Sequence, residues 1–144
     1  MYQNTKRMAE SVAEGCADAG VWRIALHDVS RTHPSFILAD LWRYGALALG
    51  SPTYNTELFP AMAHLVRLIR NKRMGNRALG VFGSFGWSGG AMAQLRELGE
   101  DPGWRLVEPA VEARGAPSDQ DLERCRALGR ELAAAGGGLA PSGI

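Results

Sequence analysis

The sequence has 144 residues, 46% of them apolar and 22% charged, as expected of one soluble domain large enough to bury a core. Its 16 basic and 15 acidic residues leave a net charge of +1, and no basic stripe with interleaved aromatic residues occurs, which argues against nucleic-acid binding. Polar residues follow Met1 at once, and no apolar run reaches membrane-spanning length. We therefore expect neither a signal peptide nor a membrane span, and a cytoplasmic location.

The amino-terminal part of the chain predicts a helix and then a strand. Asn4 and Thr5 are residue types that begin helices, and an apolar stripe follows them as far as Gly20. This pattern predicts a helix that starts about four residues into the chain. Apolar residues then alternate over residues 22–26, which predicts a strand with Asp28 near its end.

The middle of the chain continues the alternation. Pro34 is a favoured first helical residue, and the helix that it begins is predicted to extend towards Gly45. The apolar run at residues 46–50 predicts a strand buried on both faces, and the other elements are organised around it. Pro60 begins a clearly amphipathic helix, and residues 78–82 predict the next strand.

The last third of the chain predicts two more helices around one strand. The first helix covers residues 91–98, and the strand covers residues 104–107, with irregular structure expected beyond Pro109 because proline cannot donate to a sheet ladder. Ser118 and Asp121 have the spacing of a capping box at the start of the final helix.

Strands that alternate with helices predict an α/β fold in which both faces of a parallel sheet are covered, a three-layer α/β/α sandwich. We expect one domain over residues 1–135. A run of glycines ends the final helix, and residues 136–144 are expected to form a flexible tail.

Cysteine and histidine usage gives no indication of a metal or redox centre. Cys16 and Cys125 lie on apolar helix faces and are interpreted as core residues rather than as a disulfide, which favours a reducing compartment. His27, His33 and His64 are scattered, without metal-ligand spacing. We expect no metal site.

Three segments that follow strands or begin helices should meet at one edge of such a sheet: residues 1–5, 51–55 and 83–90. None contains a charged residue or a histidine, although all are rich in hydroxyl, amide, glycine or aromatic groups. A general acid or base needs a titratable group, so we expect no catalytic residue here. The composition favours a ligand that brings its own chemistry.

Within these segments, each residue also has a plainer structural interpretation. Asn4 and Thr5 could hold a phosphate through the free N–H groups of a helix start, or could serve as an ordinary helix cap. Phe85 or Trp87 could cover a planar ring, or Trp87 could simply anchor a helix. The glycines at 83, 86 and 89 lack the spacing of a dinucleotide fingerprint, and no phosphate-loop motif occurs.

The three segments resemble the FMN-binding loops of flavodoxin-like domains, in particular those of flavodiiron (A-type) flavoproteins. The residues that carry the resemblance are Tyr2-Gln3-Asn4-Thr5, Ser51-Pro52-Thr53-Tyr54-Asn55 and Gly83-Ser84-Phe85-Gly86-Trp87-Ser88-Gly89. The likeness covers residues 1 to about 135 and implies the flavodoxin fold, with family strand order 2-1-3-4-5.

The resemblance also implies how FMN is held. Asn4 and Thr5 would bind the phosphate, with Tyr2 in the same loop. Ser51, Pro52, Thr53, Tyr54 and Asn55 would form one side of the flavin site, and Ser84, Phe85, Gly86, Trp87 and Gly89 the other side. The implied role is one-electron transfer, with a di-iron domain, a rubredoxin-like protein or a reductase as partner, while the metal ligands of the di-iron half have no counterpart here.

The sequence departs from the family pattern at its start. Family members have a strand before the first loop, whereas Met1 already stands inside that loop, and Gln3 replaces a usual glycine. The missing strand would be interior, and each buried backbone group left unpaired costs on the order of 1 to 3 kcal/mol. Upstream sequence has been cut away, or the neighbouring strands close the gap, or another chain fills it.

Three functions follow as alternatives. The first is an FMN-binding electron carrier, which these segments favour over a stand-alone oxidoreductase. The second is a flavin-dependent quinone or nitro reductase. The third is a truncated module that binds no flavin. A well-folded homodimer without affinity for flavin would support this alternative. FMN binding separates the third alternative from the other two.

Overall fold

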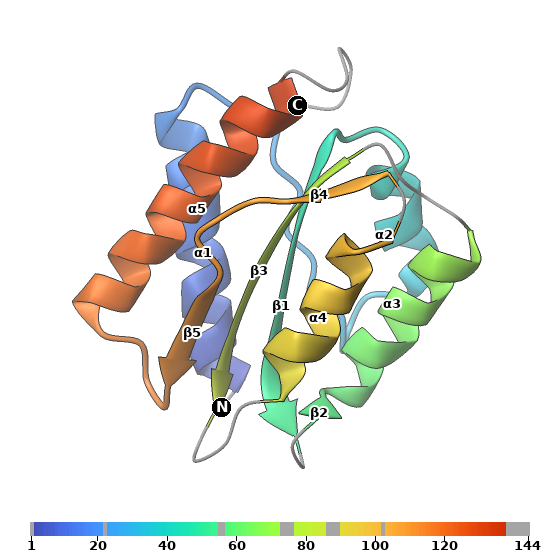
Figure 1. The fold of residues 1–144 in the computed structure, drawn as a ribbon, viewed down its shortest axis with the longest axis horizontal. Helices are drawn as coiled ribbons and strands as arrows, with labels where there is room; N and C mark the ends of the chain where they lie inside the picture. The colour runs from blue at the N-terminus through green and yellow to red at the C-terminus, as the bar shows by residue number, and fades with distance from the viewer. Residues whose placement is uncertain are drawn as a thin grey trace.

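The computed structural model describes residues 2–21, 23–54, 57–72, 77–85, 90–101 and 103–137. Within them the chain forms helices and strands in alternation along most of its length (Figure 1). The helices are α1 (Tyr2–Asp18), α2 (Pro34–Leu41), α3 (Pro60–Asn71), α4 (Ala91–Gly99) and α5 (Asp119–Gly137). The strands are β1 (Ala46–Tyr54), β2 (Glu57–Leu58), β3 (Arg77–Phe85), β4 (Trp104–Leu106) and β5 (Val111–Arg114).

The strands form one sheet in the order β2-β1-β3-β4, and β5 also pairs with β3. β1 and β3 are parallel, in a register that runs from Ala46 opposite Ala78 to Pro52 opposite Ser84. β4 pairs with the first three residues of β3, and β5 pairs with its last four residues. Both pairings are parallel. The two-residue strand β2 is antiparallel and pairs only with the last two residues of β1.

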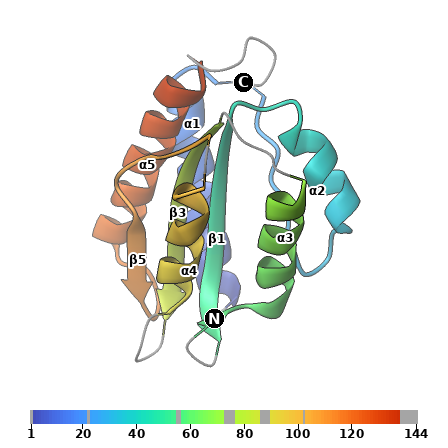
Figure 2. The same ribbon diagram turned by 45° about the vertical axis from the view of Figure 1, so that its right-hand side comes forward.

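Helices cover both faces of the sheet, as predicted for a three-layer α/β/α sandwich (Figure 2). α1 and α5 lie on one face, and α2, α3 and α4 on the other. Each layer has its own buried cluster, because the central strands are apolar on both sides. The first cluster contains Met8, Val12, Phe82, Cys125, Leu128 and Leu132; the second contains Ile37, Leu49, Leu65, Ile69, Val81, Leu95 and Leu98.

Local signals for the helix starts are largely confirmed. Proline is the first residue of α2 and of α3. The capping box before α5 makes both of its bonds: Asp121 N–H donates to Ser118 Oγ at 3.1 Å, and Ser118 N–H donates to the Asp121 carboxylate at 3.0 Å. The expected start of the first helix was wrong, because α1 begins at Tyr2 and therefore includes Asn4 and Thr5.

Three strand predictions need correction. The strand at residues 46–50 continues to Tyr54, since its last residues find a partner in β2. The chain is not irregular beyond Pro109, because Val111–Arg114 resumes pairing with β3. Arg23–Leu26 form no strand, and Trp22 lies outside the described residues. An alternating sequence needs a neighbouring strand for its backbone, and this segment has none in the described structure.

α1 and α5 approach each other closely through two glycines. A Cβ atom on Gly129 would lie 2.0 Å from the Val12 carbonyl oxygen, and one on Gly15 would lie 2.0 Å from the Arg126 carbonyl oxygen. The Cys16 thiol donates to the Gly129 carbonyl oxygen at 3.2 Å across the same contact. Only glycine allows the two helix backbones to come this near.

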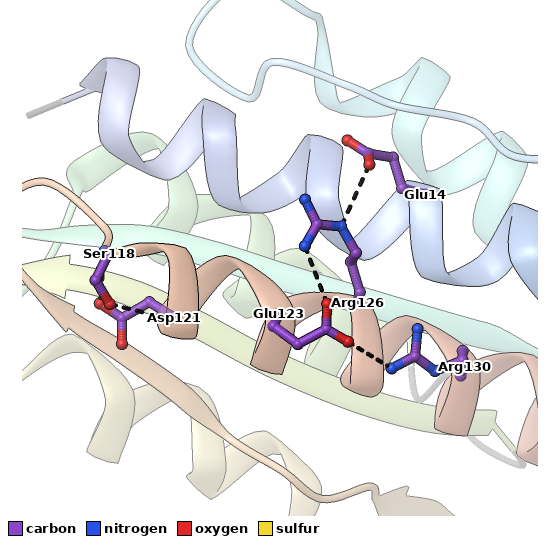
Figure 3. Close-up of polar contacts among 6 residues, drawn as sticks. All are labelled: Glu14, Ser118, Asp121, Glu123, Arg126 and Arg130. Atoms are coloured by element: carbon purple, nitrogen blue, oxygen red, sulfur yellow. Dashed lines mark hydrogen bonds and ion pairs between the residues drawn. The ribbon is translucent and has the colours of Figure 1, made fainter.

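Exposed charges border this helix pair (Figure 3). Arg126 of α5 contacts Glu14 of α1 at 3.4 Å and Glu123 of its own helix at 3.1 Å, and Arg130 contacts Glu123 at 3.1 Å. Hydrogen bonds from Arg130 and Arg126 hold the pKa of Glu123 below its usual range. These pairs are largely solvated, so each of them adds little to the stability of the contact.

Both cysteines are free, and Cys125 is fully buried, as predicted for a core residue. Burial raises the pKa of the Cys125 thiol to about 12, which keeps it protonated and unreactive at neutral pH. No helix in the described part of the chain combines the length and the apolar character needed to span a bilayer.

Candidate flavin site at the carboxyl edge of the sheet

The carboxyl ends of β1, β3 and β5 lie at one edge of the sheet, at the bottom of Figure 1. α1 begins at this edge, and so do α4 and α5, whose first residues follow β3 and β5. The first N–H groups of a helix have no partner within the helix, and they carry partial positive charge. This edge therefore combines helix N-termini, which suit an anion, with strand ends that position side chains.

A buried hydroxyl pair joins two of the three predicted loops. Thr5 Oγ1 lies 3.2 Å from Ser84 Oγ, and the two residues are 9% and 2% exposed. Thr5 is in the second turn of α1 and Ser84 is the penultimate residue of β3, so the fold brings together residues 79 positions apart. The expectation that the first and third segments meet is confirmed for this pair.

Ser51 has a structural role at the same edge. Its hydroxyl donates to the Pro52 carbonyl oxygen at 2.8 Å and accepts the Phe59 N–H at 3.1 Å. Ser51 is 1% exposed, and its bond to Phe59 links β1 to the residue that precedes α3. The side chain of Ser51 is thus engaged by the protein itself, whereas Pro52 beside it is half-buried.

β1 and β3 are held tightly at their carboxyl ends. Gly83 lies opposite Ser51, and a Cβ on Gly83 would be 2.5 Å from the Ser51 carbonyl oxygen. This close approach needs glycine at position 83 and fixes the distance between the second and third loops. Phe85, two residues further along at the end of β3, is half-buried.

The structure describes some of the remaining predicted site residues fully, some by their backbone alone and some not at all. Asn4 is half-buried in the first turn of α1. The backbones of Tyr2, Thr53 and Tyr54 lie at this edge, in the first turn of α1 and at the end of β1. Asn55, Gly86, Trp87 and Gly89 lie outside the described residues.

Two cations near this edge were not among the predicted site residues. Lys6 follows Thr5 on α1 and is exposed, and Arg114 pairs with Phe85 at the end of β5. The alternation of apolar and polar residues over Val111–Arg114 was the signal that could have placed Arg114 here. Both charges favour an anionic ligand.

The opposite edge of the sheet is closed by the protein itself. Arg77, at the start of β3, donates from Nε to the carbonyl oxygens of Leu41 at 2.9 Å and Tyr44 at 3.1 Å. Its guanidinium lies 5.6 Å from the ring centre of Trp42, and burial lowers the pKa of Arg77 below its ordinary value. The described residues contain no cluster of His, Cys, Asp and Glu able to hold a metal ion.

Comparison with known proteins places these features in one family. Residues 1–129 match the flavodoxin family. The chain is 35% identical over 135 residues to an anaerobic nitric oxide reductase flavorubredoxin of Shigella flexneri, a match that covers 92% of this chain and 28% of the relative. The chain thus spans less than a third of the curated relatives that it matches.

Solved structures agree with this assignment. The rubredoxin oxygen:oxidoreductase from the anaerobe Desulfovibrio gigas superimposes with a TM-score of 0.90 at 30% identity, covering 96% of this chain and 34% of the other. A flavodoxin from the domain Archaea, a protein of similar length, superimposes with a TM-score of 0.78 at 27% identity, covering 91% of this chain and 89% of the other.

Proposed function

The chain belongs to the flavodoxin family, and on that premise we propose that it is an electron-transfer domain that binds FMN at the carboxyl edge of its sheet. The buried contact between Thr5 and Ser84 carries the proposal, because it joins the start of α1 to the end of β3 at the edge where open α/β sheets bind ligands. We further propose residues 1–135 as the domain and residues 136–144 as its tail.

The groups present at this edge suit a phosphate better than a neutral ligand. Residues 2–4 supply first-turn N–H groups of α1, and the dipole of a 17-residue helix adds positive potential. Thr5 contributes a hydroxyl, while Lys6 and Arg114 contribute positive charge nearby. In the proposed arrangement Asn4 and Thr5 hold the phosphate, and Tyr2 lies in the same segment.

The flavin ring would lie between the second and third loops. Pro52, Thr53, Tyr54 and Asn55 form one wall in the proposal, with Ser51 as a buried support. Ser84, Phe85, Gly86, Trp87 and Gly89 form the other, with Ser84 linking this wall to the phosphate end. FMN supplies the redox chemistry, and the chain binds it, orients it and excludes water from one side of the ring.

The chain's own residues suit a carrier better than a catalyst. None of the predicted site residues is an aspartate, glutamate, histidine, lysine or cysteine that could act as a general acid or base towards a substrate. We propose that electrons pass to a di-iron domain and arrive from a rubredoxin-like protein or a reductase. The two free cysteines suit the reducing cytoplasm, where we place this activity.

An FMN titration of the purified chain, followed by quenching of flavin fluorescence, tests the proposal. We expect saturable binding in the micromolar range or tighter. Riboflavin lacks the phosphate and should bind at least about tenfold more weakly, a difference of about 1.4 kcal/mol. Equal affinity for the two flavins would contradict a phosphate site at α1, and no binding of either would contradict the proposed function.

Removal of the Thr5 hydroxyl should weaken FMN binding selectively. Thr5→Val keeps the shape of the side chain but removes the hydroxyl, and should cost FMN affinity about 0.5 to 1.5 kcal/mol while leaving riboflavin affinity nearly unchanged. Thr5→Ser retains the hydroxyl and serves as the matched control. An equal loss for both flavins in Thr5→Val would assign Thr5 to packing rather than to the phosphate.

A further inference from the structure

Arg114 is the last residue of β5 and lies at the carboxyl edge of the sheet. It pairs with Phe85, the last residue of β3, in the parallel register that joins the two strands. The ends of both strands lie at the bottom of Figure 1. The Gly115 N–H donates to the Phe85 carbonyl oxygen at 2.7 Å, and Gly115 has a φ of 69°, so the chain turns directly after Arg114. Backbone pairing therefore fixes the position of Arg114 beside Phe85.

Side chains alternate between the two faces of the sheet along β5. Val111 and Ala113 are buried in the cluster that α1 and α5 cover, whereas Glu112 and Arg114 are exposed. Successive side chains of a strand point to opposite faces. Glu112 and Arg114 therefore lie on the face opposite α1 and α5.

The same alternation along β3 places Phe85 on that face too. A Cβ at Gly83 would lie 3.6 Å from the methionine sulfur of α4, so position 83 is on the face opposite α1 and α5. Phe85 is two residues further and shares this face, while Ser84 between them meets Thr5 of α1 on the other face. Arg114 thus lies beside the third loop, on the opposite face from the contact proposed to hold the phosphate.

The protein does not neutralise the charge of Arg114. Within the described residues its exposed side chain makes no ion pair and no hydrogen bond. Glu112, the acid on the same face of β5, is farther from the end of the strand and lies opposite Gly83. Lys6, the other cation noted at this edge, belongs to α1. Since residues 51–55 and 83–90 carry no charge, Arg114 adds positive charge to a wall that has none of its own.

Reduction changes the charge of a flavin ring but not that of its phosphate. The oxidised ring is neutral, and the ring that has taken up two electrons and one proton carries one negative charge. A cation beside the ring therefore favours the reduced form, whereas a cation beside the phosphate favours both forms alike. Cations at the two ends of an FMN site thus differ in their effect on the redox potential.

We propose that Arg114 sets the preference of the flavin site for the reduced, anionic ring. The inference rests on the proposed FMN site, of which Phe85 forms part of one wall. Arg114 raises the affinity for reduced FMN more than that for oxidised FMN, and so raises the midpoint potential of the bound flavin. Glu112 has the opposite and smaller effect. The two electrons come from the proposed donor, a rubredoxin-like protein or a reductase, and the proton comes from solvent.

Arg114→Gln removes the charge and keeps a polar side chain on the exposed strand end. Reduction of the FMN-loaded chain with dithionite and indicator dyes gives the midpoint potential, and flavin fluorescence gives the affinity for oxidised FMN. We expect the ratio of the affinities for reduced and oxidised FMN to fall at least about threefold, which equals about 14 mV for a two-electron couple. Arg114→Lys keeps the charge and should restore most of this ratio.

Lys6→Gln is the matched control, because it removes a cation at the same edge but from the helix that begins at the phosphate end. It should weaken binding of both redox forms by a similar factor and leave the midpoint potential unchanged. Glu112→Gln should shift the potential in the direction opposite to Arg114→Gln. In about 1 M salt, which screens charges over about 3 Å, the effect of Arg114→Gln should largely disappear.

An unchanged midpoint potential in Arg114→Gln would overturn the inference. So would an equal shift in Lys6→Gln, or a shift that persists in high salt, because neither is expected of a charge beside the ring. The affinity of the unaltered chain for oxidised FMN, measured in the same series, tests the proposed function separately. Failure of that function appears as absence of binding, whereas failure of this inference appears as binding with an unchanged potential.

Discussion

Replacing Gly129 by alanine is expected to destabilise the protein by about 3 kcal/mol, the upper part of the range for overpacking a tight core. The added Cβ would lie 2.0 Å from the Val12 carbonyl oxygen and 2.9 Å from the Cys16 amide nitrogen, both backbone atoms that cannot rotate away. α1 and α5 would have to separate until ordinary contact is restored. Urea unfolding followed by circular dichroism measures the change.

A second helical glycine provides the control for Gly129→Ala. A Cβ on Gly99, the last residue of α4, would lie 3.3 Å from side-chain atoms of Leu106, which can move by a few tenths of an ångström. Gly99→Ala should therefore change stability by less than about 1 kcal/mol. Similar losses in the two variants would show that the α1–α5 contact is looser than described.

Replacing Gly83 by alanine is expected to affect both stability and flavin binding. The new Cβ would be 2.5 Å from the Ser51 carbonyl oxygen, which the parallel register holds opposite Gly83. The carboxyl ends of β1 and β3 must then move apart, at a cost of about 1 to 3 kcal/mol in folding. Because this distance sets the two walls of the proposed flavin site, we expect FMN affinity to fall at least about tenfold.

Gly80 on the same strand is the matched control for Gly83. A Cβ at Gly80 would meet the methyl ends of Leu132 at 2.8 Å and Leu128 at 3.0 Å, and these flexible ends can reorient. Gly80→Ala should lower stability modestly and leave FMN affinity unchanged, as it lies on the α5 side of the sheet and away from the carboxyl edge. Loss of FMN affinity in Gly80→Ala but not in Gly83→Ala would contradict the proposed site.

Most of the fold could be predicted from local sequence, and the exceptions depend on whether a strand finds a partner in the sheet. Pro34, Pro60 and the Ser118 capping box mark helix starts through bonds made within a few residues, so their signals are complete in the sequence. Residues 23–26 have the alternation of a strand but remain irregular, because a strand depends on a neighbour that local sequence does not supply. β5 was missed for the opposite reason, since β3 offers Val111 a partner after the interruption at Pro109.

The candidate site was predictable in its composition but not in its contacts. Resemblance selected Thr5 and Ser84 as site residues, and the structure adds that their hydroxyls meet. The Ser51 hydroxyl accepts a hydrogen bond from the N–H of Phe59, eight residues further along the chain, and no sequence motif predicts this contact. Arg114 joins the edge only through the pairing of β5 with β3, which is a tertiary feature.

Amide chemical shifts of the 15N-labelled chain, followed during an FMN titration, would locate the flavin on the protein. We expect the largest changes at the carboxyl edge of the sheet, at the amides of Thr5, Ser84 and Phe85. The amides of Gly45 and Arg77, at the opposite edge, should stay within error. Largest changes at that opposite edge, or along Ala46–Gly50 in the first part of β1, would contradict a flavin site at the carboxyl ends of the strands.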